Sequence, residues 1–293
     1  MTITPFQRAQ NQGPVFTAEE VARLERRAVN RIISGSQASD PDRPPPEPKN
    51  TISAVDSYND VFFERGSQVA VVYGEPRTSL ITFPSNGRIP ELTPEGQARR
   101  AERRESRSQF GQYDHPELRP LAERCIFFGS PSGPPMFPTG AYNSNYIIVQ
   151  TPDYVMILIE MVHDARIVRF NSEHPPAHVR KWLGDSIGWW EDDTLVVETM
   201  NFHPLTGIRG STPNAVLVER FTRISPHAIQ YGFTVEDPDT WTRPWTAEVQ
   251  LTKNDEPLYE YACHEGNYAM EGILAGARAE EKAAAQAANQ GSR

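Results

Sequence analysis

The sequence predicts a mainly β protein whose second half, residues 137–270, forms an antiparallel β-barrel. Short runs of β-branched and aromatic residues recur from residue 145 to 263, with turn residues and no helical pattern between them. The chain of 293 residues contains 26 prolines, which excludes an all-helical bundle because an interior proline breaks a helix. A sheet of so many strands leaves exposed edges unless it closes, so we expect a barrel rather than an open sheet.

Residues 1–50 are predicted to form an N-terminal helix and a proline-rich arm. Thr17 and Glu20 have the spacing of a capping box, and apolar residues recur at helical spacing over 18–33. Residues 40–50 hold five prolines and no apolar periodicity, which indicates an irregular arm. The arm and helix could tie subunits together, so we expect a possible homo-oligomer through this part of the chain.

Residues 51–136 are predicted to be an irregular segment that wraps the barrel. It holds candidate strands at 68–73 and 79–83, followed by a turn at 84–87 where Asn-Gly supplies a positive φ. A second helix begins at Thr93-Pro94 and runs to about Ser106. The remainder is rich in proline.

Turn residues divide residues 145–263 into strands. Acidic, Ser-Pro-His and Lys-Asn-Asp-Glu-Pro turns mark three hairpins. The expected strands are 146–150, 154–161, 166–170, 187–190, 194–201, 216–224, 229–236, 245–252 and 259–264. Residues 271–293, rich in Ala and Glu, are expected to form a helical tail.

Charge and composition exclude several classes of partner. The net charge of −9 argues against nucleic acid, and no apolar run reaches the length of a membrane span. The first ten residues lack the apolar stretch of a secretory signal, so the chain as given is predicted to be cytoplasmic, or periplasmic if it is a mature form. Cys125 and Cys263 are too few for a Cys-only zinc site, but a single bridge between them is open if the protein is exported.

The densest group of chemically active residues is Glu160, His163, Asp164 and Arg166, at the end of a very apolar strand. Histidine transfers protons near neutral pH, a carboxylate can fix its tautomer, and arginine can stabilise an oxyanion. We predict His163 as the proton carrier, Asp164 or Glu160 as its partner and Arg166 as an oxygen stabiliser. The alternative is a polar turn held by a salt bridge.

A second group follows the last expected strand. Tyr259 and Tyr261 precede His264 and Glu265; the tyrosines could contact a substrate oxygen, and His264 with Glu265 could form a second acid–base pair. The alternative is aromatic packing at a strand end. His163, His203 and His264 with a carboxylate could bind a metal, but no HExxH spacing is present and we predict no metal site.

Aromatic residues are the third feature. Trp189, Tyr231 and Trp241 are predicted to line an apolar pocket, and at least one of Trp189 and Trp190 should be inside or in an interface. The loop 237–245 could cap the mouth of that pocket or plug the core. No glycine-rich nucleotide motif is present, so no cofactor is predicted.

Together these features predict a cofactor-independent acid–base enzyme of lyase or isomerase type. Its substrate would be an apolar, oxygen-bearing small molecule undergoing elimination, hydration, isomerisation or cyclisation. Two alternatives stay open: a non-catalytic carrier of a hydrophobic ligand, and a metal-dependent hydrolase or oxygenase that uses the histidines.

Several phrases carry a family resemblance: Arg77–Ile81, Gly133–Met136, Gln150–Tyr154, Glu160–Arg166, Asp193–Val197 and Tyr259–Asn267. They resemble a large family of uncharacterised bacterial proteins, many from sphingomonads and acidobacteria and often exported, over about residues 58–282. The resemblance implies no particular activity. The rhythm of the hairpins also resembles that of lipocalin-like barrels that bind or transform apolar ligands, and a likeness of fold does not determine function.

Overall fold

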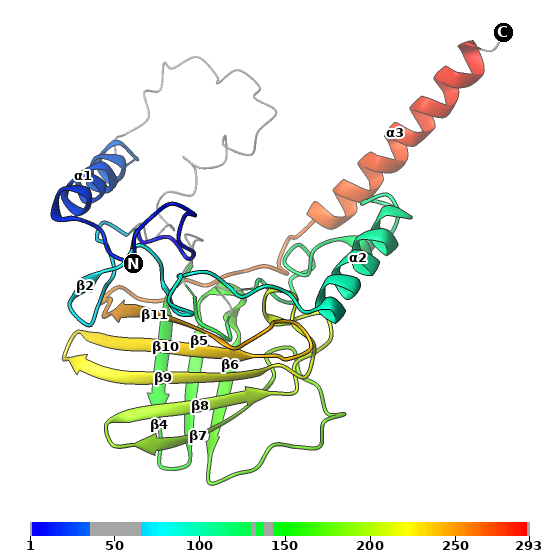
Figure 1. Ribbon diagram of the computed structural model, residues 1–293. Helices are drawn as coiled ribbons and strands as arrows, with labels where there is room; N and C mark the ends of the chain where they lie inside the picture. Colours follow the sequence, from blue (N-terminus) through cyan, green and yellow to red (C-terminus); the bar gives the residue numbers. More distant parts are fainter. Residues whose placement is uncertain (1, 36–65, 130–132, 138–142, 292–293) are drawn as a thin grey trace.

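A nine-stranded sheet is the centre of the computed structural model, which describes residues 2–35, 66–129, 133–137 and 143–291 (Figure 1). The strand order is β3-β11-β10-β9-β8-β7-β6-β5-β4. The prediction of a mainly β protein is confirmed. The strands are β3 (Ile81–Phe83), β4 (Tyr146–Gln150), β5 (Tyr154–Ile159), β6 (Ala165–Phe170), β7 (Asp185–Glu191), β8 (Thr194–Met200), β9 (Val216–Ser225), β10 (Ala228–Glu236) and β11 (Trp245–Thr252).

The sheet is mixed, whereas the sequence predicted antiparallel pairing throughout. The ladder between β6 and β7 is parallel, and every other pair in the sheet is antiparallel. Residues 171–184 connect these two strands and return the chain to the end where β6 began. A parallel pair needs such a crossover of about a dozen residues. The spacing of strands along the sequence does not reveal it.

Closure into a barrel is not confirmed. Among the described residues, no ladder joins the edge strand β4 to β3 or β11 at the other edge. In Figure 1, strands β4–β6 instead cross behind β8–β11 at a steep angle, so the sheet folds over on itself. Its inner face encloses the core between two layers.

Alternation along the strands decides which side chains enter this core. On β10, Tyr231, Phe233 and Val235 are buried, while Gln230 and Thr234 face outward, as the sequence predicted. The neighbouring strand β9 places Leu217, Glu219 and Phe221 on the inner face. One carboxylate therefore lies inside an otherwise apolar layer.

The N-terminal residues pack against the sheet. Phe6 contacts Phe137 and Trp245 edge to face, with ring centroids 4.7 and 5.9 Å apart. Thr17 then caps α1 (Ala18–Gly35) by the predicted capping box, since its hydroxyl accepts from Glu20 N–H and the Glu20 carboxylate accepts from Thr17 N–H. The predicted proline-rich arm at 40–50 lies outside the described residues.

The remaining helices flank one end of the sheet (Figure 1). Helix α2 (Pro94–Ser108) has Thr93 as its cap and confirms the predicted second helix. Helix α3 (Ala269–Gly291) begins a few residues earlier than the sequence predicted and points away from the rest of the molecule. Among all the residues that the structure describes, no helix has the length and apolar character needed to cross a membrane.

Two predicted strands are wrong or shortened. Residues 259–264 are irregular, because β11 pairs with β10 and β3 and leaves them no strand partner. Residues 68–73 contribute only β1 (Val71–Val72), which pairs with β2 (Glu75–Pro76) in a small separate sheet. The other predicted strands are present, with boundaries shifted by a few residues.

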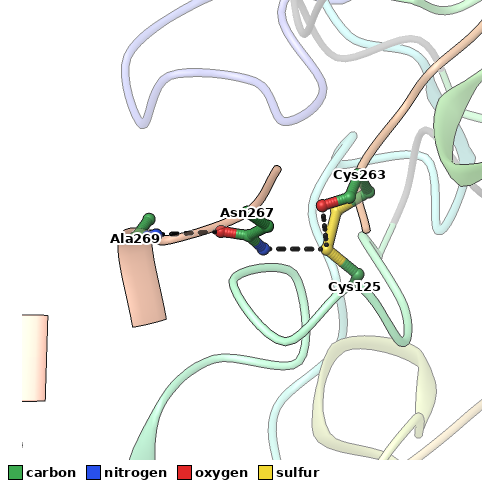
Figure 2. The surroundings of a disulfide bond; sticks show 4 residues. All are labelled: Cys125, Cys263, Asn267 and Ala269. Carbon is green, nitrogen blue, oxygen red and sulfur yellow. Dashed lines mark hydrogen bonds between the residues drawn. A yellow bond between two sulfur atoms is a disulfide. The ribbon is translucent and has the colours of Figure 1, made fainter. Parts of the chain in front are cut away.

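A disulfide joins Cys125 to Cys263, residues 138 positions apart (Figure 2). It fastens the loop after α2 to the irregular segment before α3. Figure 2 also shows Asn267, whose Nδ2 donates to Cys125 Sγ at 3.2 Å and whose Oδ1 accepts from the Ala269 N–H at 3.2 Å. The start of α3 is thereby tied to the bridge.

Candidate functional site

Glu160 lies at the end of β5 and is almost completely buried. Its carboxylate accepts hydrogen bonds from Asn143 Nδ2 at 2.6 Å and from Asn145 Nδ2 at 3.2 Å. It also accepts from the Tyr259 N–H at 3.3 Å. A buried carboxylate needs such donors to offset the cost of leaving water. Glu160 therefore holds residues 254–263, named the tail segment below, against the turn after β5.

His163 makes a second tie to the tail segment. Val162 and His163 have φ angles of 65° and 55°, so the turn between β5 and β6 bends sharply, in the left-handed region. His163 Nε2 accepts a hydrogen bond from the Tyr261 N–H at 2.7 Å. Burial raises the pKa of the neighbouring Asp164 carboxyl. Glu160 and His163 thus both act on the backbone of one segment.

Arg166 is separated from these two residues and enters the core. On β6 it forms a two-pronged ion pair with Glu219 of β9, one prong being Nη2 to Oε1 at 3.1 Å. Tyr231 of β10 donates its hydroxyl proton to Glu219 Oε1 at 2.7 Å and accepts from the Met136 N–H at 2.9 Å. Burial first, and the Glu219 charge second, raise the pKa of Tyr231 well above its usual value.

Tyr146 of β4 completes this interior cluster of Arg166, Glu219, Tyr231 and Tyr146. Burial raises the pKa of its phenol; the Arg166 charge opposes this effect and the Glu219 charge adds to it. Sequence reasoning had included Arg166 and Tyr231 but not Glu219. The available signal was the alternation on β9, which places Glu219 between Leu217 and Phe221 on the apolar face.

A cleft of about 420 Å³ lies where β4 approaches the ends of β9, β10 and β11. We call it the seam cleft. Tyr146 and Ile148 line it from β4, and Ile229 and Leu251 line it from β10 and β11. Tyr146 belongs to both groups, so the cleft and the interior cluster share a residue. The other lining residues are Ser144, Asn145, Arg223, Ser225, Pro226, His227, Ala228, Gln250, Thr252, Lys253, Asn254, Glu256 and Leu258.

The tail segment forms one wall of the seam cleft. Asn254, Glu256 and Leu258 line it, and Asn254 Nδ2 donates to Asn145 Oδ1 at 3.2 Å. The ties made by Glu160 and His163 follow directly along the chain. These two predicted catalytic residues therefore hold the wall in place, and neither lines the cleft.

The cleft carries charged side chains of both signs: Arg223 and Lys253 are cationic, and Glu256 is anionic. Arg223 donates to the carbonyl oxygens of Ser225 and Pro226, at 3.4 and 3.2 Å, and has no carboxylate partner among the described residues. Lys253 forms an ion pair with the exposed Asp255. A guanidinium bound only to neutral carbonyls keeps its charge available to a ligand.

The other predicted site residues lie elsewhere. His264 and Glu265 are exposed, just past the disulfide. Trp189 and Trp190 are both exposed on β7, so neither is inside this chain's core, and the other expectation, that one of them lies in an interface, stays a prediction. Trp241 is buried against Trp245, and its loop therefore plugs the core rather than capping a cleft. Tyr259 and Tyr261 contribute their backbone N–H groups, as described above.

No three His, Cys, Asp or Glu side chains in the described ranges gather closely enough to hold a metal ion. His203 stacks on Trp182 with ring centroids 3.9 Å apart, and His163 binds Tyr261. The structure therefore does not bring together the three histidines considered from the sequence.

The chain matches no protein-family model, no curated protein and no solved structure. The family resemblance and the likeness to lipocalin-like barrels accordingly stay predictions.

Proposed function

We propose that the protein binds an amphipathic small molecule with a carboxylate head in the seam cleft. The observation that carries the proposal is the composition of this cleft of about 420 Å³. Ile148, Ile229, Leu251 and Leu258 give it an apolar wall, and Arg223 gives it a cation without a carboxylate partner. Small-molecule sites combine an apolar lining with a few orienting polar groups in this way.

The size of the cleft and the guanidinium of Arg223 favour a fatty-acid-like ligand. Its volume is within the range of about 300–1,000 Å³ common for ligand sites. A guanidinium can bind a carboxylate through two parallel hydrogen bonds. A neutral lipid has no carboxylate and cannot form this pair. The proposal corresponds to the carrier alternative drawn from the sequence.

The test is titration of dodecanoate into the full chain by isothermal titration calorimetry. Ile148→Glu places a charge on the cleft side of β4, and we expect it to weaken binding about tenfold or more because that charge is desolvated when the acyl chain enters. Ile147→Glu is the matched control, since Ile147 directly precedes Ile148, is similarly exposed and lies outside the lining of the cleft. Equal affinities of the two variants, or no saturable binding to the unmodified protein, would contradict the proposal.

Arg223 has its own matched comparison. Arg223→Gln should weaken dodecanoate binding, whereas Arg220→Gln, which alters the same strand on its outer face, should not. If dodecanol binds as tightly as dodecanoate, the carboxylate part of the proposal fails while the apolar part stands.

An acid–base enzyme of lyase or isomerase type is the second candidate. It is favoured by the presence of two proton-bearing side chains, Tyr146 and His227, in the lining of the cleft. A catalytic role predicts that His227→Ala abolishes turnover of a bound substrate while its affinity stays within about threefold. A carrier shows no turnover with either protein.

The disulfide supports an oxidising compartment, because such bridges persist in the periplasm and outside cells and are rare in the cytosol. We therefore favour the periplasmic alternative over the cytoplasmic one. Thiol labelling of the protein isolated from periplasmic and cytoplasmic expression tests this: only the periplasmic protein should resist labelling before reduction.

A further inference from the structure

The edge strand β4 has an open row of backbone groups. The Glu160 N–H donates to the Asn145 carbonyl oxygen at 3.0 Å, and the register between β4 and β5 continues from this bond without a break. Positions that bond to the neighbouring strand alternate along an antiparallel ladder, so Ile148 and Gln150 turn their N–H and C=O groups away from β5. These groups have no hydrogen-bond partner among the described residues.

The opposite edge of the sheet, at β3, is covered. There the carbonyl oxygens of residues 5 and 6 accept hydrogen bonds from the N–H groups of Leu80 and Ile81, at 3.0 and 3.3 Å. Strand β4 has no such cover in the described part of the chain. Its sequence, Tyr-Ile-Ile-Val-Gln, also lacks the charged side chains and proline that usually prevent an exposed edge from pairing with another chain. The edge of β4 can therefore accept a further strand.

The open row borders the seam cleft. Ile148 lines the cleft from β4, and the ends of β10 and β11 together with the tail segment line it from other sides. A cleft of about 420 Å³ admits a single extended chain but not the sheet of a second copy. Arg223, whose guanidinium has no carboxylate partner among the described residues, belongs to the same lining.

We propose that the seam cleft binds a short peptide with apolar side chains and a free C-terminal carboxylate, as an added strand on β4. The peptide backbone pairs with the open groups of Ile148 and Gln150, alternate side chains contact the apolar wall, and Arg223 binds the carboxylate. This inference rests on the proposed function, because it names the class of carboxylate that the cleft takes. A fatty acid has the carboxylate and the apolar chain but no backbone to pair with the open row.

The test is titration of the peptide acetyl-Val-Ala-Val-Leu, with a free C-terminus, into the full chain by isothermal titration calorimetry. Because Glu256 also lines the cleft, the acetyl group leaves the carboxylate as the only charge of the probe. We expect saturable binding with a micromolar dissociation constant. The same peptide with a C-terminal amide should bind about tenfold more weakly, because it loses the charge-assisted pair.

Methylation of the peptide nitrogens, one at a time, tests the added strand directly. Each methyl group removes one N–H donor, and only every second residue of a paired strand turns its N–H toward its neighbour. Binding should therefore weaken about tenfold at alternate positions and change little at the positions between them.

A matched pair of variants tests the same point from the protein. Ile148→Pro removes the outward N–H without removing a hydrogen bond to β5, and an edge strand tolerates proline at such a position. Ile148→Val shortens the side chain and keeps the N–H. Relative to Ile148→Val, Ile148→Pro should weaken peptide binding about tenfold and dodecanoate binding by less than about twofold. If the proline variant does not fold, the methylated peptides still decide.

Three results would overturn this proposal: no saturable peptide binding, equal effects of methylation at every nitrogen, or equal peptide affinities of the two Ile148 variants. A dimer of the unmodified protein that Ile148→Pro dissociates, measured by sedimentation equilibrium, would also overturn it, because a second copy would then occupy the edge. Dodecanoate separates this test from that of the proposed function. If dodecanoate binds and the peptide does not, only this inference fails, and if neither binds, both fail.

Discussion

Arg166 on β6 and Glu219 on β9 form an ion pair in the interior of the folded-over sheet, with 3% and 0% of their side chains exposed. The two residues belong to the two crossing layers, so the pair connects strands that share no ladder. Tyr231 adds a hydroxyl donor to the same carboxylate. The interior cluster therefore links β6, β9 and β10 at one point in the core.

Removing one partner of this pair should be strongly destabilising. Arg166→Met leaves the Glu219 carboxylate buried with only the Tyr231 hydroxyl as a donor, and we expect a loss of about 3–5 kcal/mol in the free energy of unfolding. The double variant Arg166→Met/Glu219→Leu removes both charges and should recover most of that loss. Urea unfolding followed by circular dichroism measures both.

The control for this prediction is the ion pair between Arg220 of β9 and Glu191 of β7, whose side chains are both about half exposed. Arg220→Met should change the unfolding free energy by less than about 1 kcal/mol, because exposed pairs contribute little. A similar loss in both single variants, or no recovery in the double variant, would show that the interior pair does not behave as a buried one.

The sequence predicted the local parts of this fold because their signals are local. The hairpins around Glu191–Asp193 and Ser225–His227, and the capping box at Thr17, depend on residues a few positions apart. The alternation on β10 was equally readable, since one buried face imposes a period of two.

The parts that sequence reasoning missed depend on distant partners. The parallel register of β6 and β7 follows from the path of residues 171–184, which carry no periodic signal. The hydrogen bonds of Glu160 and His163 to the backbone N–H groups of Tyr259 and Tyr261 were not predicted, because these partners lie almost a hundred positions away. Backbone donors have no side-chain signature, so a polar turn and an acid–base site cannot be told apart from the sequence.

Asp185 should make stability depend on pH. Burial acts to raise the pKa of this carboxyl, but hydrogen bonds from Lys181 and His174 and the charges of Lys181 and Arg169 outweigh it, so the pKa is lowered on folding. A carboxyl with a lowered pKa stabilises the fold above its unfolded pKa of about 3.9 and loses that contribution as the pH falls through the folded pKa.

Asp185→Asn should therefore cost about 2 kcal/mol of unfolding free energy at pH 7, and the difference from the unmodified protein should shrink steadily below about pH 4. Asp193→Asn, in the exposed turn after β7, is the matched control and should follow the unmodified protein at every pH. Unfolding midpoints in urea between pH 3 and 8 test this. A constant difference across that range would rule out the lowered pKa.

The disulfide should contribute substantially to stability because it closes a loop between residues 138 positions apart. Replacing both cysteines, Cys125→Ser with Cys263→Ser, should lower the unfolding free energy by about 2–5 kcal/mol. Dithiothreitol should lower the unfolding midpoint of the unmodified protein to about that of the double variant. The midpoint of the double variant itself should not change. An unaltered midpoint of the unmodified protein on reduction would contradict the prediction.

His163 should act on the tail segment rather than on the fold as a whole. His163→Asn keeps a residue type that tolerates the left-handed backbone at φ 55°, and its shorter side chain ends before the position of Nε2. The Tyr261 N–H then loses its acceptor, so its hydrogen exchange should accelerate about tenfold, which corresponds to the net contribution of one hydrogen bond. His264→Asn, at an exposed position three residues beyond Tyr261, should leave that exchange unchanged.

Because the tail segment is a wall of the seam cleft, His163→Asn should also speed the release of dodecanoate. Hydrogen exchange in the core strand β10 should stay as it was. Unchanged exchange at Tyr261 would mean that His163 does not hold the wall, and the acid–base role predicted from the sequence would again be the better explanation for its position.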